Sequence, residues 1–210
     1  DQDAGLYRIV AFLTGSKNAL KGAGFFIGAV LLSWLEFQGA IAVMVAMLSV
    51  VWLMSLLLLR QELGVMKAKP KFSQIFSKSE AVNRLSLARF FLFGARDVWF
   101  VVALPVFLHE VLGWDFWQVG GYLAAWVMIY GMIQAAAPKL TGRSQAPDVV
   151  GRQLVVFGGC LALTPAAIGV ALSYGLSPVF VVTVGLLIFA LLFAMNSALH
   201  SFLIVRFARD

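Results

Sequence analysis

The sequence predicts an all-α membrane protein with six transmembrane helices, and three observations carry this prediction. Hydrophobic residues make up 61% of the 210 residues, whereas charged residues make up only 12%. The mean hydropathy is +0.92, which is unusual for a soluble domain. Apolar runs of roughly 20 residues, the length that a bilayer demands, recur along the chain without the alternating pattern of a membrane β-barrel. Helices are then the spanning elements that remain.

The apolar runs are separated by polar connections of two kinds. We expect helices at approximately 12–35, 38–59, 85–108, 117–138, 152–173 and 178–204. The turns near Glu36, Glu110–Asp115 and Gly175 contain neither lysine nor arginine. The other connections and the C-terminal end contain the basic residues Arg60, Lys67, Lys69, Lys71, Lys78, Arg84, Lys139, Arg143, Arg152, Arg206 and Arg209. Because cytoplasmic loops are rich in lysine and arginine, we expect these connections and both chain ends to be cytoplasmic.

The longest connection, Gln61–Asn83, is basic and contains Pro70. Its plainest interpretation is a solvated linker attracted to anionic lipid headgroups, and a regulatory or docking segment is the alternative. Because it follows only two helices, we expect it to be a central loop between two helical bundles. The chain begins at Asp1 without methionine, so we also expect it to be a piece of a longer protein.

Glycine and proline within the apolar runs predict how the helices pack and bend. Gly24 and Gly28 form a GxxxG motif, with Gly22 beside it, and small residues at this spacing let membrane helices approach closely. Pro105 and Pro165 fall within predicted helices, where proline removes a backbone hydrogen bond and bends the helix. Such bends suit a protein that moves, and they are equally common in static helices.

Four basic residues, Lys17, Lys21, Arg89 and Arg96, lie within or beside the membrane core. A charge at the centre of a bilayer costs about 2.5–3.5 kcal/mol, so such side chains face a protein or water-filled interior. Counted from the outer turns at about 1.5 Å per residue, Lys21 and Arg96 share one level in the cytoplasmic half. Lys17 and Arg89 share another level near the inner interface, where they can snorkel. The deeper pair therefore predicts an anionic ligand.

The spacing of these cations supports an anionic ligand, and one acid offers an alternative. Lys17 and Lys21 lie four residues apart and share a helix face, as do Arg89 and Arg96, seven apart. Like charges on one face repel unless an anion lies between them. Asp97 follows Arg96 directly, so we expect the two side chains to point in different directions. Asp97 would then pair with a cation on another helix, or carry a coupling proton.

Polar and aromatic side chains recur at helical spacing on two other predicted helices. Trp126, Tyr130 and Gln134 form a stripe that is typical of packing, although the Gln134 amide needs partners in lipid. Asn196 and His200 share a face, and we expect His200, near the inner interface, to be solvated. The residues that we assign to substrate binding are Lys21, Arg96, Lys17, Arg89, Tyr130, Gln134 and Asn196, with Asp97 assigned to proton coupling.

Other function classes lack their signatures in this sequence. It contains no HExxH, GxSxG or GxxxxGK[ST] motif and no evident acid–base pair, so we expect neither an enzyme nor a bound cofactor. The single cysteine, Cys160, allows no internal disulfide, and no cysteine–histidine spacing indicates a metal. The placement of the net charge of +6 indicates a lipid bilayer rather than nucleic acid as partner. An anion channel and a non-transporting membrane scaffold are the alternatives to a transporter.

Four segments resemble the ArsJ-type organoarsenical efflux permeases of the major facilitator superfamily. They are LTGSKNALKGAGFF at 13–26, KAKPKFSQIFSKS at 67–79, ARFFLFGARDVWFVVALPVFL at 88–108 and GWDFWQVGGYLAAWVMIYGMIQAAAPKL at 113–140. The resemblance implies twelve helices in two bundles of six, of which these are the fifth to the tenth. It assigns 1–60 to the N-terminal bundle, 61–83 to the central loop and 84–210 to the C-terminal bundle. The loop 138–152 departs from the superfamily's usual glycine and acid pattern.

The resemblance also implies an activity. Such permeases are secondary transporters that export 1-arseno-3-phosphoglycerate, an anion that a glyceraldehyde-3-phosphate dehydrogenase makes from arsenate. The exported compound falls apart and releases arsenate, so export gives arsenate resistance. We therefore expect a multi-pass protein of the bacterial inner membrane, a functional link to that dehydrogenase, and proton antiport. A major facilitator transporter for another organic anion or a drug is the alternative within the superfamily.

Overall fold

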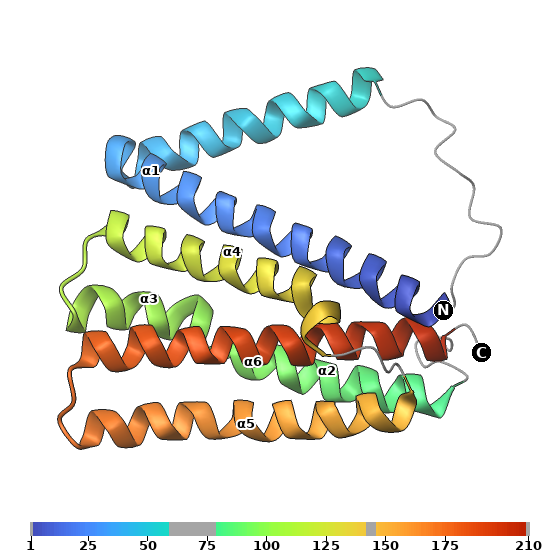
Figure 1. Cartoon of the computed structure of the whole chain (residues 1–210). Coiled ribbons are helices and arrows are strands. Elements are labelled where there is room, and N and C mark those ends of the chain that lie inside the picture. The colour runs from blue at the N-terminus through green and yellow to red at the C-terminus, as the bar shows by residue number, and fades with distance from the viewer. Residues whose placement is uncertain (1, 59–78, 142–145, 209–210) are drawn as a thin grey trace.

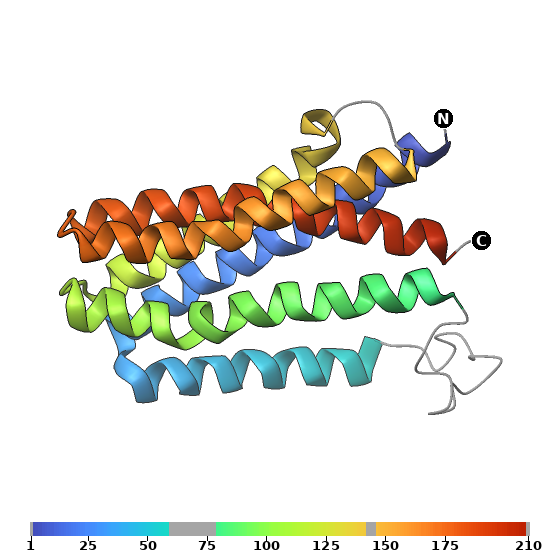
Figure 2. The same cartoon turned by 90° about the horizontal axis from the view of Figure 1, so that it is seen from below.

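The computed structural model describes residues 2–58, 79–141 and 146–208, which form helices joined by short turns (Figure 1). The helices are α1 (Gln2–Leu58), α2 (Glu80–Val98), α3 (Leu104–Val106), α4 (Phe116–Leu140), α5 (Pro147–Ser173) and α6 (Pro178–Phe207). They run roughly along one direction, and the view from below shows the same (Figure 2). The prediction of an all-α protein is confirmed for the described residues.

Five helical stretches are long and apolar enough to cross a membrane. They are Ala4–Leu58, Glu80–Val111, Phe116–Leu140, Asp148–Ser173 and Pro178–Phe207. The first stretch covers two of the predicted spans, because α1 bends at Glu36, whose φ of 56° and ψ of −176° are not helical. Figure 1 shows the chain turning back at this bend. We call residues 2–35 the first arm of α1 and residues 37–58 its second arm.

Glycine in a left-handed conformation ends two of these stretches. Gly113 has a φ of +69° and Gly175 a φ of +75°, values that residues with a Cβ rarely adopt. At Gly175 the N–H donates to the carbonyl of Leu172 at 3.0 Å. The next N–H, of Leu176, donates to the carbonyl of Ala171 at 3.3 Å, which completes a common helix C-cap. Helix ends at both glycines confirm two of the predicted turns.

The predicted turns lie together at one end of the bundle. The bend of α1, the turn before α4 and the turn before α6 are at the left of Figure 1, and both termini are at the right. The central loop Gln61–Asn83 lies outside the described residues up to residue 78, as do Arg60, Arg143 and Arg209. The described residues that flank these segments lie toward the same end as the termini, away from the three predicted turns.

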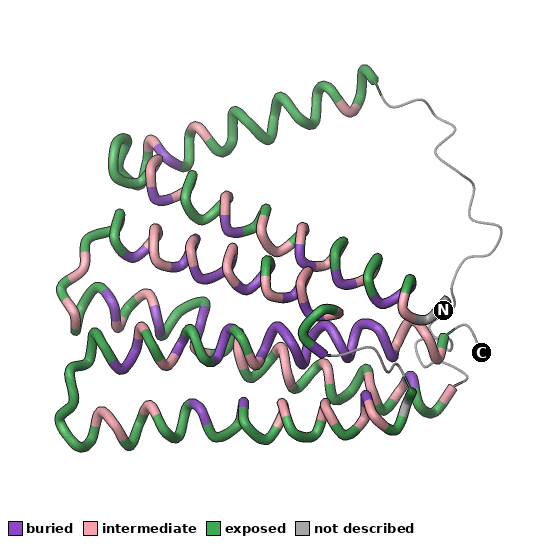
Figure 3. Tube along the Cα trace, viewed as in Figure 1, coloured by how far each residue is buried: buried purple, intermediate pink, exposed green. Residues whose placement is uncertain are grey.

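The core of the bundle forms around α6. This helix contacts α1, α2, α4 and α5, and residues 193–203 are buried without interruption (Figure 3). One cluster of buried apolar side chains joins α6 to α4 and to the 100–108 segment, and a second joins α6 to the start of α1 and the end of α4. The second arm of α1 contrasts with α6, because Ala40 is its only buried residue. Its exposed apolar surface suits lipid or further helices.

Glycines bring the first arm of α1 and α4 into backbone contact. A Cβ on Gly15 would lie 2.5 Å from the carbonyl oxygen of Gly131, and one on Gly22 would lie 2.8 Å from that of Ala124. The prediction that Gly24 and Gly28 make the close approach is wrong, because a Cβ on either would meet nothing within 4 Å. The glycines of α1 that contact the α4 backbone are instead Gly15 and Gly22, which lie seven residues apart. A GxxxG motif alone does not identify the face of an apolar helix that packs.

The third predicted span is interrupted around Pro105. π-helical turns at Trp99–Ala103 and Phe107–Val111 flank α3, which contains the proline. Proline has no N–H, and its ring clashes with the carbonyl four residues earlier, here that of Val101. The wider π-helical turns take up this misfit. By contrast, α5 continues as α-helix through Pro165.

Candidate functional site

A line of hydrogen-bonded polar side chains crosses the interior of the bundle. Asn18 of α1 donates from Nδ2 to Oε1 of Gln134 in α4 at 2.6 Å. Gln134 is fully buried and donates from Nε2 to Oγ of Ser197 in α6 at 3.1 Å. The Tyr130 hydroxyl donates to the same Ser197 oxygen at 3.3 Å. These bonds connect three helices at the centre of the molecule.

Arg89 extends this line to α2. Its Nη1 donates to Oγ of Ser201 at 2.6 Å, and that Oγ donates to the backbone carbonyl of Ser197 at 2.9 Å. We call this set the polar line: Asn18, Gln134, Tyr130, Ser197, Ser201 and Arg89. Polar groups in an apolar interior are costly unless they are hydrogen-bonded. The partners that the line provides explain how these apolar helices hold so many polar side chains.

Arg96 is held by an acid and two aromatic rings. Its Nε and Nη2 both donate to Oδ1 of Asp97, at 2.8 and 2.5 Å. Its guanidinium carbon lies 5.1 Å from the ring centroid of Phe93 and 5.0 Å from that of Phe193. The expectation that Arg96 and Asp97 point apart is wrong, because the long arginine side chain folds back to its neighbour. The Asp97 side chain is 50% exposed, so the described helices cover it only in part.

Arg89 and Arg96 share one aromatic ring. The guanidinium carbon of Arg89 lies 4.8 Å from the ring centroid of Phe93, against which Arg96 also packs. A cation over an aromatic face gains about 0.5–2 kcal/mol, depending on its desolvation. The two arginines and Asp97 together carry two positive charges and one negative charge, so one positive charge is left over. This cluster can therefore attract an anion.

Lys17 and Lys21 of α1 are exposed and belong to no hydrogen bond or ion pair among the described residues. They also share no hydrogen-bond partner with Arg89 or Arg96 among these residues. Their level in the bundle follows from a ring contact, because Phe25 and Phe100 meet edge-on at 6.4 Å. Lys21 lies four residues before Phe25, and Arg96 lies four residues before Phe100, on helices that run the same way. The two cations therefore occupy a similar level.

A cavity of about 540 Å³ lies beside Lys21. The first arm of α1 forms one wall, the beginning of α4 forms another, and Pro105 of α3 lies between them. Among the described residues, Lys21 is the one charged residue in its lining, and the other lining side chains are apolar. This volume is within the range of small-molecule sites, about 300–1,000 Å³.

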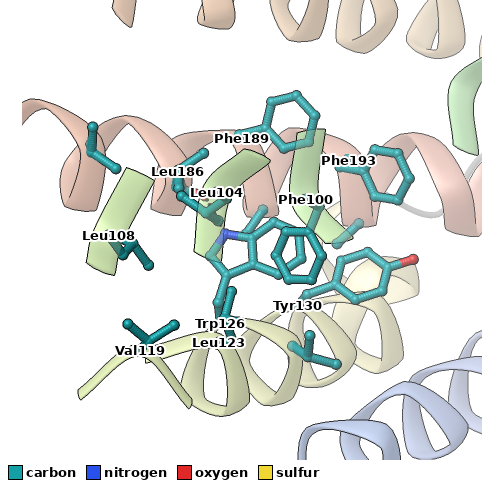
Figure 4. Close-up of a cluster of buried hydrophobic side chains, with 14 of the residues drawn as sticks. Phe100, Leu104, Leu108, Val119, Leu123, Trp126, Tyr130, Leu186, Phe189 and Phe193 are labelled. Carbon is teal, nitrogen blue, oxygen red and sulfur yellow. Dashed lines mark hydrogen bonds between the residues drawn. The ribbon is translucent and has the colours of Figure 1, made fainter. Parts of the chain in front are cut away.

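The stripe on α4 faces the core. Trp126 donates from Nε1 to the backbone carbonyl of Leu186 at 2.7 Å, and its ring packs against Phe100 with the centroids 4.5 Å apart (Figure 4). The Tyr130 ring lies between those of Trp126, 5.9 Å away, and Phe193, 5.5 Å away. Trp126 thus packs as such a stripe is expected to do, whereas Tyr130 and Gln134 combine packing with the polar line.

Asn196 and His200 form a second buried polar pair on α6. Asn196 donates from Nδ2 to the carbonyl of Leu154 in α5 at 3.3 Å, so it faces away from the polar line. His200 is only 7% exposed, and the expectation that it is solvated is wrong. Its burial follows from the position of α6 between the other helices. Asn196 Oδ1 and His200 Nδ1 have no hydrogen-bond partner among the described residues.

The sequence left part of this site unrecognised. Asn18, Ser197 and Ser201 are members of the polar line that no spacing argument singled out. Ser197 and Ser201 are four residues apart on an otherwise apolar helix, which was an available signal of a polar face. Asn18 directly follows Lys17 in the sequence. Within 2–58, 79–141 and 146–208, no three histidine, cysteine or acidic side chains lie close enough to hold a metal.

Comparisons with models of known protein families, with curated proteins and with solved structures found no match for this chain.

Proposed function

We propose that these helices belong to a secondary active transporter that exports an anionic organic solute from the cytoplasm. The observation that carries the proposal is the polar line, which ends at Arg89 inside helices apolar enough to cross a membrane. Ionisable residues within a membrane mark the pathway of a substrate or an ion more often than they serve packing alone. We assign 1-arseno-3-phosphoglycerate as the cargo, because the resemblance to organoarsenical permeases and the excess of positive charge agree on an anion.

The proposal includes a topology. Both arms of α1 cross the bilayer, which gives six crossings and puts the basic connections and both chain ends in the cytoplasm of a bacterial cell. The proposed arrangement is that of the major facilitator superfamily, with 1–60 and 84–210 on either side of a central loop. A bacterial inner membrane and a neighbouring glyceraldehyde-3-phosphate dehydrogenase complete the proposal.

Arg96 is the residue to which we assign the cargo's phosphate or arsenate. Arginine binds oxyanions through two parallel N–H bonds, and in Arg96 those donors now point to one oxygen of Asp97. An incoming oxyanion would compete with Asp97 for this guanidinium. Arg89 would add positive charge one level below, and Lys17 and Lys21 would attract the anion from the cytoplasm. Alternating access would then carry the bound anion outward.

Asp97 is the candidate proton site. Its bond to Arg96 determines whether a proton on Asp97 strengthens or weakens anion binding. A proton on Asp97 would release Arg96, so protonation and anion binding favour each other. Because the proton and the anion would bind together, export of the anion together with a proton is an alternative to antiport. The membrane potential could drive it, because each elementary charge moved gains about 2.3 kcal/mol per 100 mV. Proton movement during export into inside-out vesicles separates the two mechanisms: alkalinisation of the vesicle lumen indicates antiport, and acidification of the lumen indicates co-export.

The test of the cargo assignment is Arg96→Ala in the full-length protein. Inside-out vesicles would be supplied with 1-arseno-3-phosphoglycerate, and its accumulation in the lumen would be measured. We expect the initial rate to fall by roughly tenfold or more, because a charge-assisted bond contributes about 1.5–3 kcal/mol. Arg84→Ala is the matched control, since Arg84 lies on the same helix but pairs with the exposed Glu80. An unchanged rate in the Arg96 variant would remove Arg96 from the mechanism.

A further inference from the structure

Three glycines line the cavity beside Lys21, and two of them leave open space in it. Gly24 and Gly28 lie one turn apart on the first arm of α1, and a Cβ on either would meet nothing within 4 Å. The neighbouring face of the same helix differs, because a Cβ on Gly15 or Gly22 would clash with backbone atoms of α4. One face of α1 therefore uses glycine to pack, and the adjacent face uses glycine to leave space.

The cavity has one charged end and apolar walls. Lys21 lies at the end nearest the chain termini, and the lining continues along α1 through Leu32. Phe25 and Phe116 stand in the walls, from α1 and α4. The ammonium group of Lys21 has no hydrogen-bond or ion-pair partner among the described residues, whereas Arg89 and Arg96 both have one. A free cation at the end of an apolar cavity is complementary to one anionic group on an apolar body.

We propose that this cavity binds an amphiphilic monoanion, an organic acid with one carboxylate or sulfonate and an aromatic or aliphatic body. The acid group would pair with Lys21, and the body would lie over Gly24 and Gly28 between Phe25 and Phe116. The proposal goes beyond the export of 1-arseno-3-phosphoglycerate, because that compound has no apolar part and carries more charge than one lysine neutralises. The same chemistry could come from a free organic acid or from an anionic membrane lipid.

The first experiment measures the charge requirement. The full-length protein in nanodiscs of phosphatidylcholine would be titrated by calorimetry with 4-phenylbutyrate, with its neutral amide and with 3-phosphoglycerate. We expect saturable binding of 4-phenylbutyrate and binding roughly tenfold or more weaker for the amide, because the ion pair with Lys21 is lost. Lys21→Met should weaken the binding of 4-phenylbutyrate by a similar factor. Lys139→Met, at the exposed end of α4, is the matched control and should leave this binding unchanged.

The second experiment tests whether the ligand occupies the cavity over Gly24 and Gly28. Gly28→Leu should fill the cavity and abolish binding of 4-phenylbutyrate. Gly159→Leu is its control, because a Cβ there also meets nothing within 4 Å and the residue lies on α5, outside the cavity. Retained melting temperature in both variants shows that folding is unaffected. Equal binding of acid and amide, or unchanged binding in both the Lys21 and the Gly28 variant, would overturn the proposal.

The remaining outcomes identify the source of the ligand. Loss of 4-phenylbutyrate binding when phosphatidylglycerol is added to the discs assigns the cavity to an anionic lipid and supports the proposal. Undiminished binding assigns it to a free organic acid and also supports it. Binding of 3-phosphoglycerate alone overturns it and favours the organoarsenical as occupant. Failure of the proposed export function would appear separately, as absent organoarsenical transport by a protein that still binds 4-phenylbutyrate.

Discussion

Arg89 shows how a charged residue is accommodated in this bundle. It donates to the Ser201 hydroxyl on one side and packs on the Phe93 ring on the other. Ser201 in turn donates to the backbone carbonyl of Ser197, the residue whose Oγ accepts the bonds from Gln134 and Tyr130. The serine therefore links the cation to the buried amide, although its own side chain is small. Removing it should affect both folding and the position of the guanidinium.

Ser201→Ala is expected to destabilise the protein by about 0.5–2 kcal/mol, the range of interhelical hydrogen bonds in membranes. The reason is that Arg89 Nη1 loses its acceptor inside the bundle. Ser173→Ala is the control, because Ser173 is exposed and bonds only to its own helix at Val170. Chemical unfolding in mixed micelles measures both. Equal midpoints for the two variants would show that the Arg89 bond contributes nothing to stability.

Asp97→Asn is expected to strengthen anion binding. The neutral amide competes less for Arg96 than the carboxylate does, so the guanidinium is free to bind an oxyanion. Calorimetric titration with inorganic phosphate measures this, with Glu80→Gln on the same helix as control. An affinity for phosphate that is identical in Asp97→Asn and the unaltered protein would show that Asp97 does not compete for Arg96.

At the scale of elements, the contact between the first arm of α1 and α4 requires glycines, whose side chain is a single hydrogen atom. A Cβ on Gly131 would lie 2.6 Å from the backbone nitrogen of Ala19 and 2.6 Å from the carbonyl oxygen of Gly15. These are backbone atoms, so neither can rotate away as a side chain could. The two helices would have to separate, and the bond from Asn18 to Gln134 lies on this interface.

Gly131→Ala is therefore expected to lower stability by about 1–3 kcal/mol, as overpacked interiors do. Gly121→Ala is the matched control on the same helix, where a Cβ meets nothing within 4 Å. The control should be neutral or more stable by up to about 1 kcal/mol, because alanine favours a helix more than glycine does. Thermal unfolding followed by circular dichroism separates the two. A control that is as unstable as Gly131→Ala would refute the close approach.

For the whole molecule, the two ends of the bundle make the topology testable. Glu110 lies at the end with the non-basic turns, and Glu80 lies at the end with the termini, and both are exposed. After replacement of Cys160 by alanine, single cysteines at these positions would be labelled with a membrane-impermeant maleimide. We expect Glu110→Cys to react in intact cells and Glu80→Cys only after permeabilisation. The reverse pattern would invert the proposed orientation.

The sequence by itself determined the all-helical, apolar character of the chain and the places where it turns. Hydrophobic length and turn residues act locally, so the bends at Glu36, Gly113 and Gly175 could be located from composition alone. The similar level of Lys21 and Arg96 also followed from counting residues at about 1.5 Å each.

Only the tertiary structure decided which face of each helix meets which neighbour. These helices are apolar around most of their circumference, so periodicity carries little information about the inward face. For this reason the sequence favoured Gly24 and Gly28 for packing, whereas Gly22 and Gly131 pack and the first two line a cavity. The burial of His200 and the polar line from Asn18 to Arg89 arise in the same way, because they exist only once several helices are placed around α6.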